Sequence, residues 1–434
     1  MGLFASKTKK IKPAKGLTGT VQFPGDKSIS HRYAMLGAIA EGTSEIHFFA
    51  TSADCQSTLS CLKQLGVKLE RKDHVVTIQG AGLGGLRPSP EPLNAGNSGS
   101  TMRMLAGILA GQPFRSVITG DASLSARPMK RIAEPLSQMG AAVKLREGGL
   151  PPLAIEGGAL KPIRYEMPVA SAQVKSAILL AGLFAEGETE VIEKERTRDH
   201  TEIALEQMGA DIGRHARSIA VRGRARLEGK KFYVPGDLSS AAFFIVAGLV
   251  TSNSNLMLHN VGLNPTRTGI LDVLVAMGGR VAVVNLEMLN GELIGDLHVE
   301  TSKLAGGEIP ESAVPGVIDE LPVLAVLGTQ TEQGLSFRGA GELRVKESDR
   351  LAAVAENLRR MGAEVEEFPD GLRVAGRQTL HGAEIDPHDD HRIAMAFTVA
   401  GLIAQGDTHI KNSSCVDISF PGFFDMLAGV TERR

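Results

Sequence analysis

The chain has 434 residues and carries 47 basic against 49 acidic side chains, so its formal net charge is −2. This balance excludes a protein that binds nucleic acid or an anionic membrane through an overall positive charge. The length predicts two or three domains, and aromatic residues at only 4% of the sequence disfavour the stacking of single-stranded bases.

The first segment is basic, with lysines at positions 7, 9, 10, 12 and 15. No apolar core follows these lysines, so we expect a frayed, solvated tail and no secretory signal. The longest apolar runs, Ala241–Val250 and Ile393–Ala404, are too short to cross a bilayer and are predicted to be buried helices. The cysteines form no Cys-x-x-Cys pair, which predicts a reduced, cytoplasmic location and no structural zinc. They are Cys55, Cys61 and Cys415.

An internal repeat organises the chain, because a small-residue turn that leads into an apolar helix occurs six times. The six segments begin at Gly25, Gly96, Val169, Gly236, Val317 and His388. A second helix follows each one, and five of these helices end in Leu-Gly or Met-Gly, a pattern typical of a helix C-terminus. The glycines are Gly66, Gly140, Gly209, Gly278 and Gly362. Short alternating strands come next, so each unit is predicted as strand–helix–strand–helix–strand–strand.

The repeats predict an α/β (α+β) fold with two domains. Parallel strands need helical crossovers whereas the closing strands can form a hairpin, so the sheets should be mixed. Six units are too many for one core, which favours three repeats per domain. We assign residues 1–24 and 235–434 to one domain and 25–234 to the other, with hinges near 24 and 235. The sixth repeat lacks its last strands, and we expect Ile11–Gln22 to complete it.

Many of the repeated helix starts carry a Lys or Arg side chain, and helix N-termini attract anions on their own account. Taken alone, each of these groups is better explained as a surface cation near a helix start. Their recurrence at one place in the repeat predicts a cleft for anions with phosphate and carboxylate groups. The candidate contacts are Lys27, Ser28, Arg32, Gly99, Ser100, Arg103, Arg127, Ser171, Gln173, Lys175, Arg198, Lys346, Arg350 and Arg392.

Two carboxylates stand in the same turns. Asp319 is either a helix N-cap or a general base, and Glu347 is either a solvated acid at a helix start or a general acid. Ser348 is a candidate cap for the helix that follows. In the run from His388 to His391, adjacent ligands cannot all face one point, so a hydrogen-bonded or acid–base His391 is favoured over a metal site.

Three common motifs for nucleotide binding or serine catalysis do not fit this sequence. It contains neither the P-loop pattern nor the GxSxG elbow of serine hydrolases. The glycines of Ala81–Leu86 follow a predicted strand but do not open a helix, which argues against a dinucleotide site.

Six motifs in this order, GDKSISHR, GNSGSTMR, GDASLSARPM, SAQVKSA, RVKESDR and DDHRIAM, resemble the 5-enolpyruvylshikimate-3-phosphate (EPSP) synthase family. The resemblance covers about residues 20–430. It implies a two-domain inside-out α/β barrel of six βαβαββ repeats, three per domain, which closes over shikimate 3-phosphate and phosphoenolpyruvate. The 5-hydroxyl attacks C2 of phosphoenolpyruvate, C3 takes up a proton, and phosphate leaves. The family uses no metal and no organic cofactor, and its product leads to chorismate and the aromatic amino acids.

The family's functional residues transfer onto this chain by motif. Those implied for shikimate 3-phosphate are Lys27, Ser28, Arg32, Ser171, Gln173 and Lys346. Those implied for phosphoenolpyruvate are Lys27, Gly99, Ser100, Arg127, Gln173, Arg350 and Arg392. Further substrate-binding positions are Arg103, Ala172 and Arg198. The catalytic set comprises Asp319, which takes the 5-hydroxyl proton, Glu347 and Lys27, which serve proton transfer at C3, and the nearby His391.

The chain departs from many family members at four positions, because Ala172 replaces a second Ser, Glu342 an Asn, Ile418 a Lys, and Ser100 a Thr. The motifs also resemble the bacterial branch that includes glyphosate-tolerant members, which often carry Ala where this chain has Gly99. Glyphosate is a longer analogue of phosphoenolpyruvate, and the resemblance implies that it competes for that site.

Two other functions are weighed against this resemblance. UDP-N-acetylglucosamine enolpyruvyl transferases use a reactive cysteine before an Arg-Pro pair, and here that stretch reads DASLSARP. A non-catalytic anion-binding module of the same repeat would not need Asp319 and Glu347. We therefore expect a monomeric enzyme whose partners are its two small-molecule substrates, with no nucleic acid and no membrane.

Overall fold

The computed structural model describes residues 7–433, whose contacts divide the chain into two compact units. Unit 1 contains the residues up to Pro24, Gly236–Glu287 and the residues from Leu293 on, and unit 2 contains Gly25–Pro235 and Met288–Glu292. The expected boundaries left Met288–Glu292 in the other domain. These five residues belong to unit 2 because Asn290 and Glu292 bond there, to the backbone N–H of Tyr233 (2.9 Å) and to His200 (2.7 Å).

Unit 2 has three four-stranded sheets built on one plan, which confirms the mixed sheets that the repeat predicts. In each, two parallel strands are followed by an antiparallel hairpin, in the orders β14-β3-β5-β4, β6-β7-β9-β8 and β10-β11-β13-β12. The strands are β3 (Thr43–His47), β4 (Lys68–Lys72), β5 (Val75–Gln79), β6 (Leu93–Asn94), β7 (Arg115–Thr119), β8 (Ala142–Arg146), β9 (Leu150–Glu156), β10 (Arg164–Glu166), β11 (Glu188–Ile192), β12 (Ile212–His215), β13 (Ser218–Arg222) and β14 (Lys231–Tyr233).

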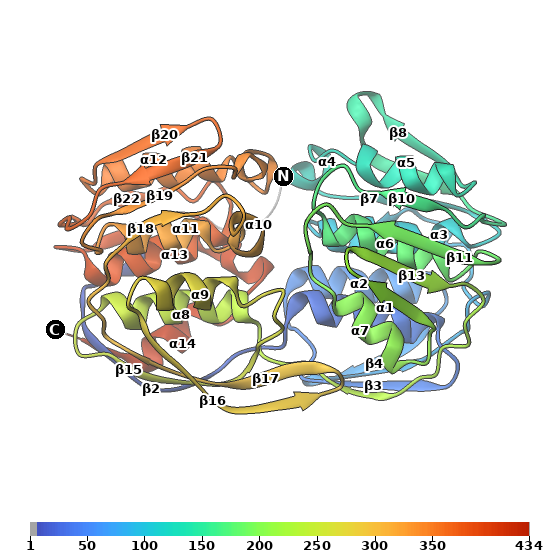
Figure 1. The fold of residues 1–434 in the computed structure, drawn as a ribbon, viewed down its shortest axis with the longest axis horizontal. Coiled ribbons are helices and arrows are strands. Elements are labelled where there is room, and N and C mark those ends of the chain that lie inside the picture. Colours follow the sequence, from blue (N-terminus) through green and yellow to red (C-terminus); the bar gives the residue numbers. More distant parts are fainter. Residues whose placement is uncertain (1–6, 434) are drawn as a thin grey trace. The chain divides into compact units, whose positions relative to one another are not determined.

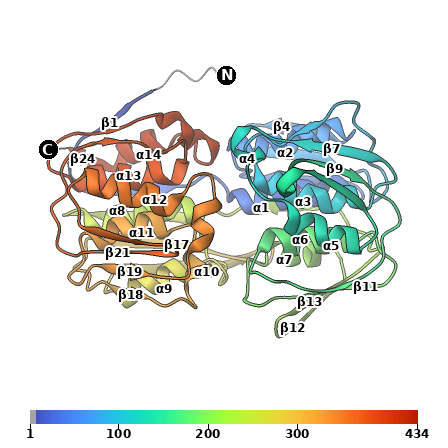
Figure 2. The same ribbon diagram turned by 90° about the horizontal axis from the view of Figure 1, so that it is seen from above.

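The helices of unit 2 fill its interior and the sheets lie outside them, the inside-out arrangement that Figure 1 and Figure 2 show. Helix α3 packs along α6, and α1 packs on α3 and α7. The first helices of the three repeats are buried on nearly all sides, which explains why their sequences are apolar all round. The helices are α1 (Lys27–Ile39), α2 (Ala53–Gln64), α3 (Gly99–Ala110), α4 (Ala122–Ser125), α5 (Lys130–Gln138), α6 (Ala172–Gly182) and α7 (His200–Gln207).

Unit 1 repeats the plan in β18-β19-β21-β20 and extends it in β16-β17-β15-β2-β24, whereas its third sheet, β1-β23-β22, is shorter. The strands are β1 (Lys9–Ile11), β2 (Ala14–Gln22), β15 (Asn255–Gly262), β16 (Arg280–Leu289), β17 (Glu292–Glu300), β18 (Gly307–Ile309), β19 (Leu335–Phe337), β20 (Val365–Phe368), β21 (Gly371–Val374), β22 (Glu384–Ile385), β23 (Thr408–Ile410) and β24 (Thr431–Arg433). The helices are α8 (Leu238–Val250), α9 (Gly269–Ala276), α10 (Val314–Val317), α11 (Leu321–Gly328), α12 (Arg350–Arg360), α13 (His391–Ile403) and α14 (Phe423–Val430).

The N-terminal segment corrects two expectations. Strand β1 does complete the sixth repeat, antiparallel to β23, but β2 runs parallel to β15 in the fourth repeat, so Ile11–Gln22 does not act as one unit. A βαβ repeat needs a first strand parallel to its second, and β2 supplies this strand to the repeat that begins at Gly236. In the same way, β14, which lies just before Gly236, supplies the first repeat with its parallel strand, next to β3. The basic segment is therefore no frayed tail, and Lys10 forms an ion pair with Asp407 (2.6 Å).

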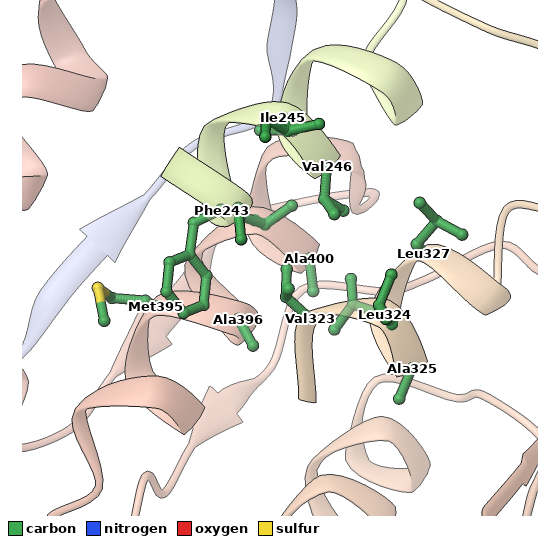
Figure 3. Packing of buried hydrophobic residues seen from close by; sticks show 14 of the residues in the cluster. Phe243, Ile245, Val246, Val323, Leu324, Ala325, Leu327, Met395, Ala396 and Ala400 are labelled. Atoms are coloured by element: carbon green, nitrogen blue, oxygen red, sulfur yellow. The ribbon is translucent and has the colours of Figure 1, made fainter. Parts of the chain in front are cut away.

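The core of unit 1 forms where α8, α11 and α13 meet, and Figure 3 shows their side chains interlocking. Phe243 and Val246 of α8 face Leu324 of α11 and Ala396 and Ala400 of α13, all of them buried. The two long apolar runs of the sequence are these buried helices, as predicted. Within residues 7–433, no helix combines the length and the apolar character needed to span a membrane.

The five glycines predicted to end the second helices all do so. Each follows the last helical turn with a positive φ between 83° and 107°, a conformation that glycine adopts without strain. These glycines mark the point at which each second helix ends and the chain turns into the closing hairpin.

The close approach of α3 and α6 yields a stability prediction. A Cβ atom on Gly107 would lie 2.1 Å from the backbone oxygen of Ala177. We expect Gly107→Ala to destabilise the protein by about 1–3 kcal/mol, in spite of the better helix propensity of alanine. Gly158→Ala is the control because its Cβ would meet nothing within 4 Å. Urea unfolding measures both, and equal midpoints for the two variants would contradict the packing argument.

Candidate active site

The start of helix α1 brings together the predicted residues of the first repeat. Asp26 caps the helix by accepting a hydrogen bond from the backbone N–H of Ile29 (2.9 Å). Lys27 Nζ donates to the Asp54 carboxylate on α2 (2.8 Å), and the Arg32 guanidinium donates back to the carbonyl oxygen of Ser28 (2.9 Å). The predicted group Lys27, Ser28 and Arg32 is thus held at one helix start.

Arg32 is almost fully buried, and hydroxyl groups rather than a carboxylate hold it. Its Nε donates to Thr201 Oγ1 (2.7 Å) and its Nη2 to Ser176 Oγ (2.9 Å). Burial lowers the pKa of Arg32 to about 10, Glu202 opposes this shift, and the positive charge of Arg198 adds to it. Arg32 remains a cation at neutral pH and lies within electrostatic reach of Arg198.

The starts of α3 and α6 form a second group. Arg103 Nη1 donates to Gln173 Oε1 (2.6 Å), and Gln173 Nε2 donates to Ser100 Oγ (3.0 Å). The Cβ position of Gly99 lies 3.3 Å from Arg103 Nη1 and 3.6 Å from Arg127 Nη1. Five predicted residues from two repeats therefore meet around the first turn of α3.

Further hydrogen bonds hold Arg127 and the start of α6 in place around this group. Arg127 Nη2 donates to Asn97 Oδ1 (2.7 Å), and Asn97 in turn donates to Asp121 (2.8 Å), which caps α4. Ser171 caps α6 by accepting a bond from Val174 N–H (3.4 Å), and Ala172 is the first residue of that helix.

One predicted anion contact is wrong. Lys175 is only 1% exposed and makes ion pairs with Glu193 (3.0 Å) and Glu202 (2.6 Å). Its ammonium group is occupied by two buried carboxylates. The helical pattern placed Lys175 near the start of α6 but could not tell which face it occupies.

In unit 1, a third group surrounds the start of α12. Arg350 is 1% exposed, and three carboxylates face it: Asp390 (Nε–Oδ2, 2.8 Å), Glu347 (Nη2–Oε2, 2.6 Å) and Asp319 (Nη1–Oδ1, 3.6 Å). Lys346 Nζ also lies 3.6 Å from Asp319 Oδ1. Asp319, Lys346, Glu347 and Arg350, predicted at two different turns of the fifth repeat, thus lie in one cluster.

Arg392 joins this cluster from the start of α13. Its Nη1 donates to the backbone oxygen of Asp319 (2.8 Å) and lies 3.5 Å from Glu320 Oε1. Asp390 caps α13 by accepting from the Arg392 backbone N–H (2.9 Å). The neighbouring His391 is buried, with 2% of its surface exposed.

The structure decides two questions about helix caps that the sequence left open. Asp319 is not a helix cap, since it lies between α10 and α11 and the residue before α11 is Glu320. The cap of α12 is Asp349, which accepts from Ala352 N–H (3.0 Å), and not Ser348, whose hydroxyl donates to Asp390 instead (3.1 Å). Polar residues next to each other at a helix start differ too little in propensity for the sequence to choose between them.

The histidine run and the cysteines take different places. His388 is exposed and contacts Glu356 (3.2 Å), whereas His391 is buried. In the described part of the chain, no three His, Cys, Asp or Glu side chains gather in a way that suits a metal ion. All three cysteines are buried free thiols, and burial raises the pKa of each to about 12, so they stay protonated at neutral pH.

Two carboxylates of these groups were not predicted. Asp54 pairs with Lys27 and Asp390 pairs with Arg350, and both carboxylates are buried. A buried cation requires a partner of this kind, so each buried Lys or Arg was a signal to search for one. Asp390 also stands beside His391, within the run that the sequence singles out.

The arrangement is suited to binding anions and to moving protons. In unit 2, Arg, Gln and Ser donors converge at the starts of α1, α3 and α6, and in unit 1 the Asp319 carboxylate lies 3.6 Å from both Lys346 and Arg350. The sequence pattern of EPSP synthase (3-phosphoshikimate 1-carboxyvinyltransferase) matches residues 11–427. The chain belongs to the EPSP synthase family.

Relatives support this membership along the whole chain. The protein named 3-phosphoshikimate 1-carboxyvinyltransferase from Solibacter usitatus is 54% identical over 98% of this chain and 100% of its own, and that from Koribacter versatilis is 53% identical over the same shares. The structure of EPSP synthase from Acinetobacter baumannii superimposes with a TM-score of 0.88, 44% identity and 99% of each chain covered. NikO, an enolpyruvyl transferase from Streptomyces tendae, shares the fold at 18% identity (TM-score 0.77).

The charge cluster around Arg350 in unit 1 yields a prediction for stability and pH. Burial raises the pKa of the Asp390 carboxyl, but the charge of Arg350 and its hydrogen bond lower it, and the net shift is downward. Asp390→Asn should cost about 3–5 kcal/mol at neutral pH, because it breaks a buried ion pair. A carboxyl with a lowered pKa stabilises the fold above its unfolded pKa of about 3.9, and that contribution is lost as the pH falls through the folded pKa.

Urea unfolding of both proteins between pH 7 and pH 3 measures this dependence. The difference between wild type and Asp390→Asn should be largest above about pH 5 and should shrink toward acid pH. A difference that stays constant over the whole range would show that the ion pair with Arg350 is not its source.

Proposed function

We propose that this chain is a 3-phosphoshikimate 1-carboxyvinyltransferase, which transfers the enolpyruvyl group of phosphoenolpyruvate to the 5-hydroxyl of shikimate 3-phosphate. The observation that carries the proposal is the Asp319 carboxylate, which lies 3.6 Å from both Lys346 and Arg350 in a chain of this family. The two cations favour its ionised form, which is the form that accepts a proton.

Shikimate 3-phosphate is assigned to donors of unit 2 with one from unit 1. Ser28, Arg32, Ser171 and Gln173 bind its phosphate and ring, and Lys346 binds a ring hydroxyl. Arg198 adds a second cation close to Arg32, which suits a dianionic phosphate. Ala172 has no side-chain donor and contributes only its backbone N–H at the start of α6.

Phosphoenolpyruvate is assigned to the cations around α3 and to those of unit 1. The residues proposed for it are Lys27, which also contacts shikimate 3-phosphate, and Gly99, Ser100, Arg103, Arg127, Gln173, Arg350 and Arg392. The planar guanidinium groups pair bidentately with its carboxylate and phosphate. The main-chain N–H groups at the start of α3 add donors at the Gly99 turn.

In the proposed reaction, Asp319 accepts the proton of the 5-hydroxyl as its oxygen bonds to C2 of phosphoenolpyruvate. Glu347 or Lys27 delivers a proton to C3, which gives a tetrahedral intermediate with a methyl group. The C2–O bond to phosphate then breaks and C3 returns a proton to the same group. The proton held by Asp319 leaves with the phosphate, so the enol ether and hydrogen phosphate remain. His391, buried beside Asp390, is proposed to support the charges of this cluster.

The two alternative functions, a UDP-N-acetylglucosamine enolpyruvyl transferase and a non-catalytic anion-binding module, are less well supported. The stretch Asp121–Arg127 contains serines and no thiol. Of the three cysteines, Cys55 and Cys61 lie buried in α2, and Cys415 is also buried. A module that only binds anions has no use for a carboxylate among cations. Phosphate release with phosphoenolpyruvate plus either shikimate 3-phosphate or UDP-N-acetylglucosamine tests all three functions, and release with the second acceptor alone would overturn the proposal.

We also propose a monomeric, cytoplasmic enzyme that acts on these two small molecules without nucleic acid. Three separate, free cysteines support a reducing location. The chain crossings at 24–25 and 235–236 are proposed as hinges that respond to bound anions. Analytical ultracentrifugation tests the monomer, and small-angle scattering with and without shikimate 3-phosphate tests the hinges.

The base assignment predicts the effect of Asp319→Asn. The amide keeps the shape of the side chain but cannot accept the hydroxyl proton, so kcat should fall by about 10²–10⁴-fold while both KM values change far less. Asp272→Asn, which alters an exposed carboxylate on α9 of the same unit, serves as the control. Turnover close to wild type in Asp319→Asn would refute the assignment.

The geometry around Gly99 predicts the response to glyphosate. A methyl group there would stand 3.3 Å from Arg103 Nη1 and 3.6 Å from Arg127 Nη1, within the site proposed for phosphoenolpyruvate. A methyl-sized clash costs about 1–3 kcal/mol, which is roughly 5- to 150-fold in binding, and it should affect the longer inhibitor more than the substrate.

Steady-state inhibition measures this difference. We expect glyphosate to inhibit the unmodified enzyme competitively with phosphoenolpyruvate, and Gly99→Ala to raise the inhibition constant more than the KM. Tolerance of millimolar glyphosate with Gly99 in place would show that another residue controls the fit.

A further inference from the structure

Lys175 forms the centre of a buried charge cluster that the proposed reaction does not use. Its side chain projects from α6 and is 1% exposed, and the side chains of its partners Glu193 and Glu202 are 4% and 0% exposed. The ammonium nitrogen lies 3.0 Å from Glu193, 2.6 Å from Glu202 and 3.4 Å from the backbone oxygen of Thr197. One cation thus joins a helix, the segment after β11 and the next helix.

The segment after β11 carries Arg198, one of the proposed substrate contacts. Glu193 accepts hydrogen bonds from both the backbone N–H (3.0 Å) and the hydroxyl of Thr197, the residue next to Arg198. Lys175 binds Glu193 and the Thr197 carbonyl oxygen together. Lys175 therefore ties the backbone that carries Arg198 to α6.

The second arm of the cluster reaches the other proposed phosphate contact. Glu202 lies on α7 directly after Thr201, whose hydroxyl accepts the Arg32 Nε–H (2.7 Å) and meets Ser176 Oγ (2.7 Å). Ser176 follows Lys175 in the chain and itself accepts Arg32 Nη2–H (2.9 Å). Consecutive residues of α6 therefore hold the helix that positions Arg32.

The electrostatics of the cluster depend on Lys175. Burial raises the pKa of the Glu202 carboxyl, and the charge and hydrogen bond of Lys175 oppose that rise. Without Lys175, two carboxylates would remain in the same dry interior, where an uncompensated charge is strongly destabilising.

We propose that Lys175 is a positioning residue for the shikimate 3-phosphate site, because it fixes both the segment that carries Arg198 and the helix that orients Arg32. The inference rests on the proposed function, in which these two arginines bind the phosphate of that substrate. Lys175 itself touches no substrate. Since the cluster serves one substrate and not the other, its loss should separate the two KM values.

The experiment compares Lys175→Met with a charge-compensated variant, Lys175→Met/Glu202→Gln. The single variant removes the ammonium group, keeps the side-chain length and leaves two carboxylates unpaired. The double variant removes one of those carboxylates as well, and replacement of buried ion clusters by neutral groups is often tolerated. Both lack the tie between α6 and the Arg198 segment. Gly182→Ala is the matched control, because it disturbs the other end of α6, where its Cβ would lie 2.7 Å from Val221.

We expect the KM and the calorimetric Kd for shikimate 3-phosphate to rise at least tenfold in both Lys175 variants, with the KM for phosphoenolpyruvate within about twofold. Thermal stability should fall in the single variant and recover in the double variant, while the defect in shikimate 3-phosphate binding persists. A purely structural role predicts that binding recovers along with stability.

Three outcomes would overturn the inference. The first is shikimate 3-phosphate binding close to wild type in a folded Lys175 variant, and the second is an equal rise of both KM values. The third is the same binding defect in Gly182→Ala at matched stability. If the wild type releases no phosphate with both substrates, the proposed function fails and the inference fails with it, whereas an active wild type with unaffected Lys175 variants defeats the inference alone.

Discussion

A cation can leave water only when a carboxylate or several hydrogen-bond acceptors replace its hydration, and the site of this protein is organised by that constraint. Lys27 pairs with Asp54, Lys175 with Glu193 and Glu202, and Arg350 with Asp390 and Glu347. Each pairing joins a helix start to a side chain from another segment. Among these pairs, Arg350 with Asp390 joins two repeats, the fifth and the sixth, whereas the others hold segments of a single repeat together.

The same constraint separates two kinds of cation at the predicted positions. Lys175 and Arg350 are 1% exposed and are held by carboxylates, so their geometry is set by the protein alone. Arg103 and Arg127 also bond to neutral groups, namely the amide oxygens of Gln173 and Asn97 and the hydroxyl of Ser123. A guanidinium group carries five N–H donors in a planar fork, so it can bond to such neutral groups and also suits the oxygens of a carboxylate or phosphate.

Much of this fold follows from the sequence because the signals are local. The five helix-ending glycines, the buried helices α8 and α13 and the mixed sheets each depend on residues close together in the chain, and all were predicted. The exchange of β2 and β14 between repeats depends on pairing partners 237 and 186 residues away, and no local pattern carries that information. The N-terminal segment was misjudged for this reason, since its lysines describe its surface and not its strand partners.

The residues of the candidate site also divide into those that local sequence patterns predict and those that depend on distant contacts. Residue types at repeated helix starts indicate anion binding, and the motifs of the family narrow this to named positions. The helical pattern cannot show which of these side chains turns inward, so Lys175 was counted as an anion contact and its two glutamates were overlooked. Whether a cation at a helix start can meet a ligand depends on the burial of its side chain as well as on its charge. In α6 the consecutive residues Lys175 and Ser176 are both buried, and both serve the polar network beneath the site instead of facing a ligand.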